Sequence, residues 1–402
     1  SATTALIRNF TPNRVETFSV AFHDKAYDES GYQNQMAAYL GTNHHQIRCS
    51  YLDIAEQFKN VIWHTERPIV RTAPTPLFML SQLVRDTKFK VVLTGEGSDE
   101  ILGGYDIFKE ALIRTFWARN PESAWRPALL QRLYPTLPLS PSKAKFYLET
   151  FYKDGLAQTD RYYFSHMQRI ATTSKVKSFF TKEVKDEIGA YDSLQSFGQE
   201  LPANIDRWHH LARAQYLEAR SLLSGYLLSS QGDRVTAAHG VEGRYPFLDH
   251  RLVEFAATIP PSHKMLGLRE KFVLKKAMAK ELPDDILKRV KQPYMAPDSN
   301  SFVQADSPSY IKETLSESAL QRAGLFNPVM VGKLQEKCTK LYHAHLSFKD
   351  NMSFVGILST QLLAEQFVHN FQQPNSLARA DFRTWFDESA NAQSARVSKL
   401  RP

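Results

Sequence analysis

The residues best suited to catalysis lie in one short acidic loop, VVLTGEGSDEILGGY at 91–105. It contains Glu96, Asp99 and Glu100, and the glycines beside Glu96 let a ligand approach the backbone closely. If a helical turn begins in this loop, spacings of three and four place these carboxylates on one face. The loop therefore predicts either an acid–base site or a metal site.

Phosphate chemistry is compatible with such a loop on one of two conditions. Carboxylates repel phosphate unless Mg²⁺ lies between the two kinds of oxygen, or unless one carboxylate serves as a general base. The resemblance to a dinucleotide-binding fingerprint fails at its third glycine, where Glu100 stands. A solvated acidic turn is the structural alternative. The strand before the loop and the glycines around it favour a functional site.

A second group of unusual residues follows between 232 and 292. Glu242 and Arg244 are two residues apart, so in an extended segment they point the same way and form an ion pair, which we interpret as structural. Lys271 precedes an apolar helical run, and a lysine at a helix start can point into an anion site. Lys275 and Lys276 lie inside that run, where a solvated face is the expectation.

Histidine and cysteine give weaker signals. His44, His45 and Cys49 could suggest a metal, but adjacent histidines in a helix-to-strand turn are more typical of a structural role. Cys49 and Cys338 cannot form a disulfide framework and suit a reducing, cytoplasmic setting. No zinc-ligand spacing or nucleophile elbow is present in the sequence.

The composition sets the class of protein. The chain has 402 residues, 43% hydrophobic and 23% charged, which is ordinary for a globular protein. No run approaches the roughly 18 apolar residues of a membrane span. The net charge of +8 fits phosphate-bearing partners without choosing among nucleotides, nucleic acid and anionic membrane.

The elements that position these residues are predicted from alternating strand and helix patterns in the first third of the chain. Strands are predicted at 16–22, 45–49 and 90–95, and helices at 29–40, 52–66, 76–86 and from 105. This order predicts an α/β fold with a doubly wound parallel sheet, which binds ligands at the carboxyl ends of its strands. We expect one domain over 1–371, with an α/β core at 1–120, a mainly helical part at 121–230, and a motif-bearing helical part at 231–371. A mobile tail is expected at 372–402.

Taken together, several segments resemble the synthetase domain of glutamine-dependent asparagine synthetases, which belong to the adenine-nucleotide α-hydrolase (PP-loop ATPase) group. They occur in the family's order: TFSVAF, LGTNHHQI, APTPLFMLS, VVLTGEGSDEILGGY, HGVEGRYPFLD, LREKFVLKKA and LPDDILKRVKQ. The resemblance implies that ATP activates the β-carboxylate of aspartate as an acyl-adenylate. Ammonia, normally supplied from glutamine, then gives asparagine and AMP.

The resemblance also implies roles for single residues. Glu96 resembles the base that takes the proton of ammonia, and Lys271 the lysine that neutralises pyrophosphate and the adenylate. Asp99 resembles the ligand of the Mg²⁺–pyrophosphate. The remaining positions resemble nucleotide-binding residues, at Val20, Thr94 and Gly95, and residues near aspartate, at Ser98 and Glu100.

Two family features do not occur in this sequence. The S-G-G-x-D-S loop that wraps pyrophosphate is not found, and Ser1 resembles its last serine. The glutaminase domain with its terminal cysteine is not found either. We therefore expect such a domain as a partner, with a homodimer as a further possibility, and we do not expect full synthetase activity from this chain alone.

Rival interpretations stay open. Relatives of this fold close β-lactam rings or peptide macrocycles, but the ring-closing enzymes carry a tyrosine where Glu96 stands. A ligase that makes another amide is an alternative, because the acceptor pocket cannot be identified from the sequence. An RNA-binding or tRNA-modifying PP-loop protein is another. It is disfavoured because the basic residues lie within the catalytic-type motifs rather than in a separate basic arm. A catalytically inactive scaffold is the last alternative.

Overall fold

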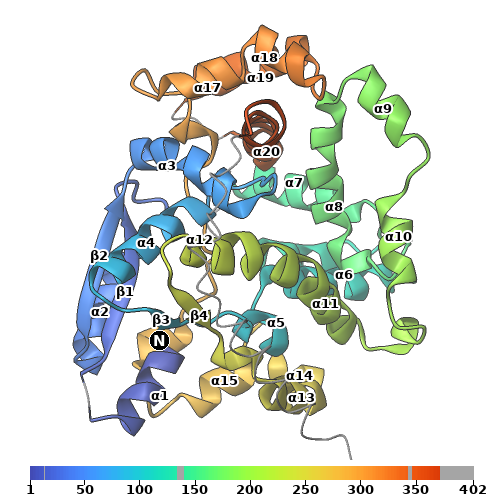
Figure 1. Ribbon diagram of the computed structural model, residues 1–402. Coiled ribbons are helices and arrows are strands. Elements are labelled where there is room, and N and C mark those ends of the chain that lie inside the picture. The colour runs from blue at the N-terminus through green and yellow to red at the C-terminus, as the bar shows by residue number, and fades with distance from the viewer. Residues whose placement is uncertain (13, 134–139, 343–345, 372–402) are drawn as a thin grey trace, which may run out of the picture.

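A computed structural model describes residues 1–12, 14–133, 140–342 and 346–371 (Figure 1). The first third contains the predicted alternation of helices and strands. Its elements are α1 (Ala2–Phe10), β1 (Glu16–Phe22), α2 (Ser30–Leu40), β2 (Asn43–Cys49), α3 (Tyr51–Thr65), α4 (Pro74–Asp86) and β3 (Val91–Leu93).

Local sequence explains where these helices begin and end. Gly41 ends α2 in the left-handed conformation, with φ of 63°, which glycine adopts without strain. Ser50 and Asp53 form a reciprocal capping box at the start of α3. Pro74 occupies the first turn of α4, where a missing backbone N–H costs nothing.

The described strands form two parallel pairs. β1 pairs with β2 from Glu16–Asn43 to Phe22–Cys49, and β3 pairs with β4 (Glu242–Arg244). Parallel pairing confirms the α/β class, while a continuous doubly wound sheet stays a prediction. β3 is shorter than the predicted strand at 90–95 because β4 offers only three residues to pair with. The N–H of Thr94 still donates to the carbonyl of Arg244 at 3.0 Å.

Helices dominate the rest of the described chain, as predicted (Figure 1). Those that follow the acidic loop, pack against α5 or belong to residues 232–292 are α5 (Ser98–Leu102), α6 (Asp106–Ala118), α11 (His210–Glu218), α12 (Arg234–Ala237), α13 (His250–Thr258), α14 (Pro261–Lys264), α15 (Phe272–Ala277) and α16 (Asp284–Lys288). The more distant helices are α7 (Pro141–Lys153), α8 (Met167–Thr173), α9 (Lys182–Ile188), α10 (Ser193–Gln199), α17 (Ser309–Thr314), α18 (Glu317–Ala323), α19 (Pro328–Lys340) and α20 (Phe348–Ala364).

α11 and α12 are the two ends of one long helix, and the stretch between them is π-helical at Ala219–Leu227 and Ser229–Asp233. The expected connection at 121–145 contains a 3-10 helix at Arg126–Arg132. The predicted tail at 372–402 lies outside the described residues.

The main hydrophobic core joins β1, α3, α4 and α20. Phe58 and Ile62 of α3 and Val355 and Leu358 of α20 are fully or almost fully buried within it. A smaller cluster around Trp117 packs α6 against α7. The second cluster holds α6, at one end of the acidic loop, whereas β3 at the other end is held by its pairing with β4. Within the described part of the chain, no helix has the length and apolar character needed to cross a membrane.

Candidate active site

The acidic loop turns sharply from β3 into α5. Gly97 is the N-cap of α5 and has a φ of 91°, which side-chain-bearing residues rarely adopt. A Cβ at this position would lie 2.3 Å from Cδ2 of Leu248, so only glycine fits beneath that side chain. The turn aims the first residues of α5 inward, and Ser98, Asp99 and Glu100 are all buried.

Two lysines converge on Asp99. The ammonium of Lys271 lies 2.9 Å from Oδ1 of Asp99, and that of Lys291 lies 3.4 Å from Oδ2. Burial by itself raises the pKa of Asp99, but the two lysine charges outweigh burial and lower it. Gly104 closes the site from behind, because a Cβ there would lie 1.9 Å from Oδ1 of Asp99. The geometry therefore concentrates positive charge at the end of β3.

Lys271 reaches this position through an unusual backbone. It is the N-cap of α15 with a φ of 49°, the left-handed region that a non-glycine residue occupies only when its surroundings require it. The prediction that Lys271 lies near a helix start is confirmed. The expectation of a solvated face holds for Lys276, which is exposed, but is wrong for Lys275. The ammonium of Lys275 donates to Glu270 at 2.8 Å and to the carbonyl of Arg289 at 3.0 Å.

Sequence reasoning did not single out Lys291 or Glu270. Lys291 stands in the segment LPDDILKRVKQ among other basic residues, and nothing local distinguishes it from a solvated lysine. Glu270 is an isolated acid in a basic run, which is the one signal that could have marked it. Its side chain is almost fully buried, and its carboxylate forms ion pairs with Lys109 of α6 and Lys275 of α15.

Glu100 occupies a different environment from its neighbour Asp99. Its Oε1 accepts a hydrogen bond from the Tyr105 hydroxyl at 2.9 Å, and only 2% of the residue is exposed. Burial raises the pKa of Glu100 to about 7. The charges of Asp99 and then of Glu218 raise this pKa further. Glu218, on α11, is fully buried and accepts hydrogen bonds from His166 and Arg169.

The remaining predicted residues of the loop lie nearer to solvent. The hydroxyl of Thr94 donates to a carboxylate oxygen of Glu96, which is partly exposed, and Gly95 is exposed. The carbonyl of Gly95 accepts from the N–H of Ser98 at 3.3 Å. One turn thus contains all the predicted residues of the loop, and Lys271 at the start of α15 contacts it through Asp99. The residues of the turn are Thr94, Gly95, Glu96, Ser98, Asp99 and Glu100.

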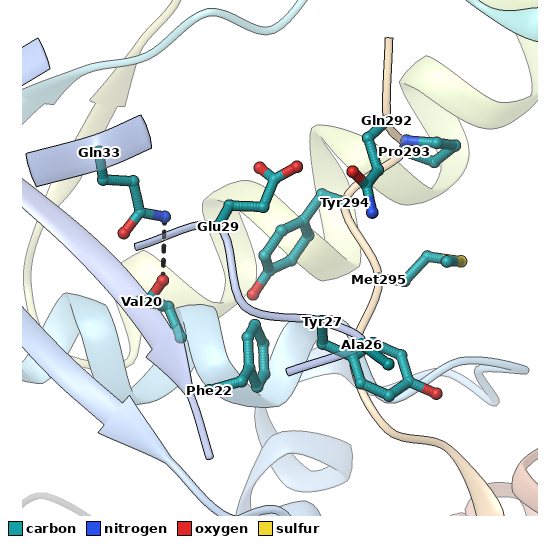
Figure 2. Close-up of a pocket in the computed structure, with 10 residues that line it drawn as sticks. All are labelled: Val20, Phe22, Ala26, Tyr27, Glu29, Gln33, Gln292, Pro293, Tyr294 and Met295. Carbon is teal, nitrogen blue, oxygen red and sulfur yellow. Dashed lines mark hydrogen bonds between the residues drawn. The ribbon is translucent and has the colours of Figure 1, made fainter. Parts of the chain in front are cut away.

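Val20 lies apart from this loop, in a small pocket at the end of β1 (Figure 2). The amide of Gln33 donates to the carbonyl of Val20 at 3.0 Å. The cavity of about 20 Å³ has room for a water molecule, so an adenine ring would fit here only after Gln33 leaves the Val20 carbonyl and the lining opens. Its lining comes from β1, the following loop, α2 and the segment after Lys291: Val20, Phe22, Ala26, Tyr27, Glu29, Gln33, Gln292, Pro293, Tyr294 and Met295.

The other sequence candidates have structural roles. Arg244 donates to Glu242 at 2.8 Å on the surface, as the structural interpretation of this pair predicted. His45 pairs with Glu16 at 2.6 Å, and His44 contacts the hydroxyls of two residues on β1. Among the described residues, no group of three or more histidine, cysteine, aspartate or glutamate side chains is arranged to hold a metal.

Asp99 as arranged does not fit the predicted Mg²⁺ ligand. Each of its oxygens already contacts a lysine ammonium, so a lysine would have to leave before the carboxylate could bind the ion. Mg²⁺ is commonly held by one or two carboxylates together with substrate phosphates, so its assignment to Asp99 stays a prediction.

Comparison with known proteins identifies relatives across most of the chain. The sequence profile described as asparagine synthase matches residues 1–365. A protein named amidase chyE, from Penicillium rubens, is 29% identical over 72% of this chain and 44% of the relative. Amidase chry2 of Gibberella zeae is 28% identical over 71% of this chain and 44% of the relative. The protein named asparagine synthetase [glutamine-hydrolyzing] 1 of Bacillus subtilis is 25% identical over 78% and 47%. The chain thus spans less than half the length of these relatives.

Proposed function

This chain belongs to the asparagine synthase family, and on that premise we propose that it carries the synthetase site of a ligase that uses ATP to convert aspartate into asparagine. Ammonia from a glutaminase domain is the nitrogen source in this proposal, and the setting is the cytoplasm. The observation that carries the proposal is the convergence of Lys271 and Lys291 on Asp99, directly after the parallel strand β3. Phosphate ligands bind at such strand ends in α/β folds.

The first proposed step is adenylation. A β-carboxylate oxygen of aspartate attacks the α-phosphorus of ATP, and the bond from that phosphorus to pyrophosphate breaks. Lys271 and Lys291 exchange their contacts with Asp99 for the pyrophosphate oxygens, whose charge increases as the bond breaks. Stabilising developing charge with preorganised cations is usually a large catalytic contribution.

The second proposed step is amide formation. The nitrogen of ammonia attacks the acyl carbon, the bond from that carbon to the AMP oxygen breaks, and a proton moves from nitrogen to the Glu96 carboxylate. Glu96 suits this role because it is partly exposed and is oriented by the Thr94 hydroxyl. Val20, at the end of β1, is proposed to bind the adenine through its backbone, with Thr94 and Gly95 lining the nucleotide and Ser98 and Glu100 near aspartate.

A ligase that makes a different amide is the second candidate. Relatives named amidases are 28–29% identical to this chain, whereas the Bacillus subtilis asparagine synthetase is 25% identical. These similarities therefore support both candidates, which differ in the acceptor carboxylate. The same adenylation chemistry would apply to another carboxylic acid.

ATP–pyrophosphate exchange tests this proposal directly. In a protein that joins this chain to the S-G-G-x-D-S loop of the family, we expect exchange that depends on added aspartate. The same protein should form AMP and asparagine in equal amounts when ammonium is supplied, as detected by mass spectrometry. Lys291→Met should reduce exchange at least tenfold, because one of two cations at the pyrophosphate is lost. Lys276→Met, which removes an exposed lysine of α15, the helix that begins after Lys271, is the matched control and should leave exchange unchanged.

The acceptor decides between the two candidates. Exchange supported by another carboxylic acid, with none supported by aspartate, would contradict the asparagine assignment and favour the second candidate. Equal, mild effects of Lys291→Met and Lys276→Met would contradict the proposed pyrophosphate site itself.

A further inference from the structure

We propose that Glu270 is a positioning residue that sets the backbone of both lysines of the anion site, Lys271 and Lys291. This inference rests on the proposed function, because it takes those lysines to bind pyrophosphate. Glu270 directly precedes Lys271 in the chain, and its Oε1 accepts the backbone N–H of Lys291 at 3.1 Å. One carboxylate therefore connects the two segments that carry the lysines.

Glu270 is itself anchored on the core of the molecule. Its Oε2 lies 2.9 Å from the ammonium of Lys109 on α6, and that ammonium also lies 3.0 Å from Asp106. Lys109 is 4% exposed and belongs to a helix packed into two hydrophobic clusters. The position of Glu270 is thus fixed relative to α6, and α6 is continuous with the acidic loop through Gly103 and Gly104.

A second connection ties the Lys291 segment to α15. Lys275 donates to Oε1 of Glu270 at 2.8 Å and to the carbonyl of Arg289 at 3.0 Å. The segment at 289–291 is therefore held at two backbone groups, one of them through Glu270. Because the left-handed conformation of Lys271 is costly, it requires surroundings that hold it, and the buried Glu270 beside it is one of them.

Glu270 carries a full negative charge at neutral pH. Burial by itself raises its pKa, but the hydrogen bonds from Lys275 and Lys109 outweigh burial and lower the pKa to about 2. A buried negative charge this near an anion site repels pyrophosphate by its charge alone. Its electrostatic effect and its positioning effect on pyrophosphate affinity therefore have opposite signs, and a variant can distinguish them.

The experiment is a calorimetric titration of inorganic pyrophosphate into the wild-type protein and its variants. Glu270→Gln removes the charge and keeps the size. If Glu270 acts by position, pyrophosphate should bind at least about tenfold more weakly, since hydrogen bonds to a charged group are lost. If it acts only by charge, binding should tighten. The matched control is Asp284→Asn, which neutralises an exposed carboxylate of the same basic segment and should leave binding unchanged.

A double-mutant cycle shows whether Glu270 acts through Lys291. In the Lys291→Met background, Glu270→Gln should weaken pyrophosphate binding less than it does in the wild type, because only the effect through Lys271 remains. A purely structural role would give equal effects in both backgrounds. Thermal unfolding of each variant checks folding. If Glu270→Gln does not fold, Glu270→Asp keeps the charge but shortens the reach, and it should also weaken binding.

The outcomes separate the two proposals. Wild-type protein that binds no pyrophosphate would contradict the anion site under Proposed function. Pyrophosphate binding by the wild type, with equal or tighter binding by Glu270→Gln or wild-type affinity in Glu270→Asp, would contradict only the positioning role of Glu270. Equal losses in both arms of the cycle would also overturn it.

Discussion

Asp99 and Glu100 are neighbours in the chain, yet their surroundings shift the pKa values of their carboxyl groups in opposite directions. Two lysines lower the pKa of Asp99 against the effect of burial, while burial raises that of Glu100 to about 7. Glu96 differs from both because it is partly exposed and accepts a hydroxyl hydrogen bond. Active sites commonly use two acids whose surroundings give them different pKa values, so that one can act as an acid and the other as a base. The sequence predicted three carboxylates together, but the different surroundings of Asp99 and Glu100 depend partly on contacts that are distant in the chain.

At the residue scale, Glu96→Gln should separate the two proposed steps. The amide cannot accept a proton from the attacking ammonia, so amide formation should fall by about 10²–10⁴. ATP–pyrophosphate exchange should remain near the wild-type rate, because adenylation does not use this group. Both rates can be measured on one preparation, and wild-type amide output from this variant would rule out the base assignment.

Glu100 should make stability depend on pH in a predictable direction. Its pKa is raised from 4.5 to about 7 on folding. Between these values the folded protein keeps a proton that the unfolded chain has lost, so the free energy of unfolding falls as pH rises through this window. In Glu100→Gln, the free energy of unfolding should fall by about 2 kcal/mol less between pH 5 and pH 8 than it does in the wild type. This figure follows because each unit of pKa shift corresponds to about 1.36 kcal/mol.

Urea unfolding at the two pH values measures this effect. Asp284→Asn, at an exposed carboxylate, is the control and should follow the wild-type pH dependence. If the curves of Glu100→Gln and the wild type run parallel, Glu100 does not titrate in this range.

At the element scale, local patterns predicted most helices and strands of the first third. The strand at 16–22 was predicted with its observed bounds because its apolar and β-branched run is unambiguous, and Gly41 marks the end of α2. β3 was predicted too long because its length depends on β4, which lies far away in the chain. Lys291 and Glu270 were missed for the same reason: their partners come from α5, α6 and α15, and no local pattern encodes those contacts.

The turn between α5 and α6 should tolerate no side chain at Gly104. In Gly104→Ala the new Cβ would meet Oδ1 of Asp99 at 1.9 Å, so Asp99 must shift away from its two lysines. We expect a loss of about 1–3 kcal/mol in stability, as for other overpacked sites, and a large loss of pyrophosphate affinity.

Gly332→Ala is the matched control for this change. Gly332 lies inside α19 with nothing within 4 Å of a new Cβ, so alanine should stabilise the helix by about 0.5–1 kcal/mol. Chemical denaturation and pyrophosphate titration of both variants test the pair. Normal pyrophosphate binding by Gly104→Ala would show that the Asp99 geometry is not needed for the anion site.

At the scale of the whole molecule, one segment connects the two parts of the proposed ATP site. Lys291 contacts Asp99 in the acidic loop, and the next residues, Gln292–Met295, line the pocket at the end of β1 (Figure 2). Arg289 fixes the start of this segment through an ion pair with Glu29 and by stacking over the Tyr32 ring at 4.1 Å. Movement of the segment would thus change the phosphate part and the adenine part together.

Gln33 should oppose nucleotide binding at the adenine part alone. Its amide donates to the carbonyl of Val20, which is the proposed acceptor for adenine, and its own oxygen accepts from Gln46 at 3.3 Å. Gln33→Met keeps the length of the side chain but frees that carbonyl, so AMP should bind a few-fold more tightly, by up to the roughly 1 kcal/mol of one hydrogen bond. Inorganic pyrophosphate should bind as in the wild type, because Lys271 and Lys291 are untouched. Lys291→Met should weaken the binding of both ATP and pyrophosphate. Calorimetric titrations of AMP, ATP and pyrophosphate into each variant measure these affinities. Weaker AMP binding by Gln33→Met would instead mean that Gln33 contacts the base, and the adenine would then lie against α2 rather than on the Val20 carbonyl.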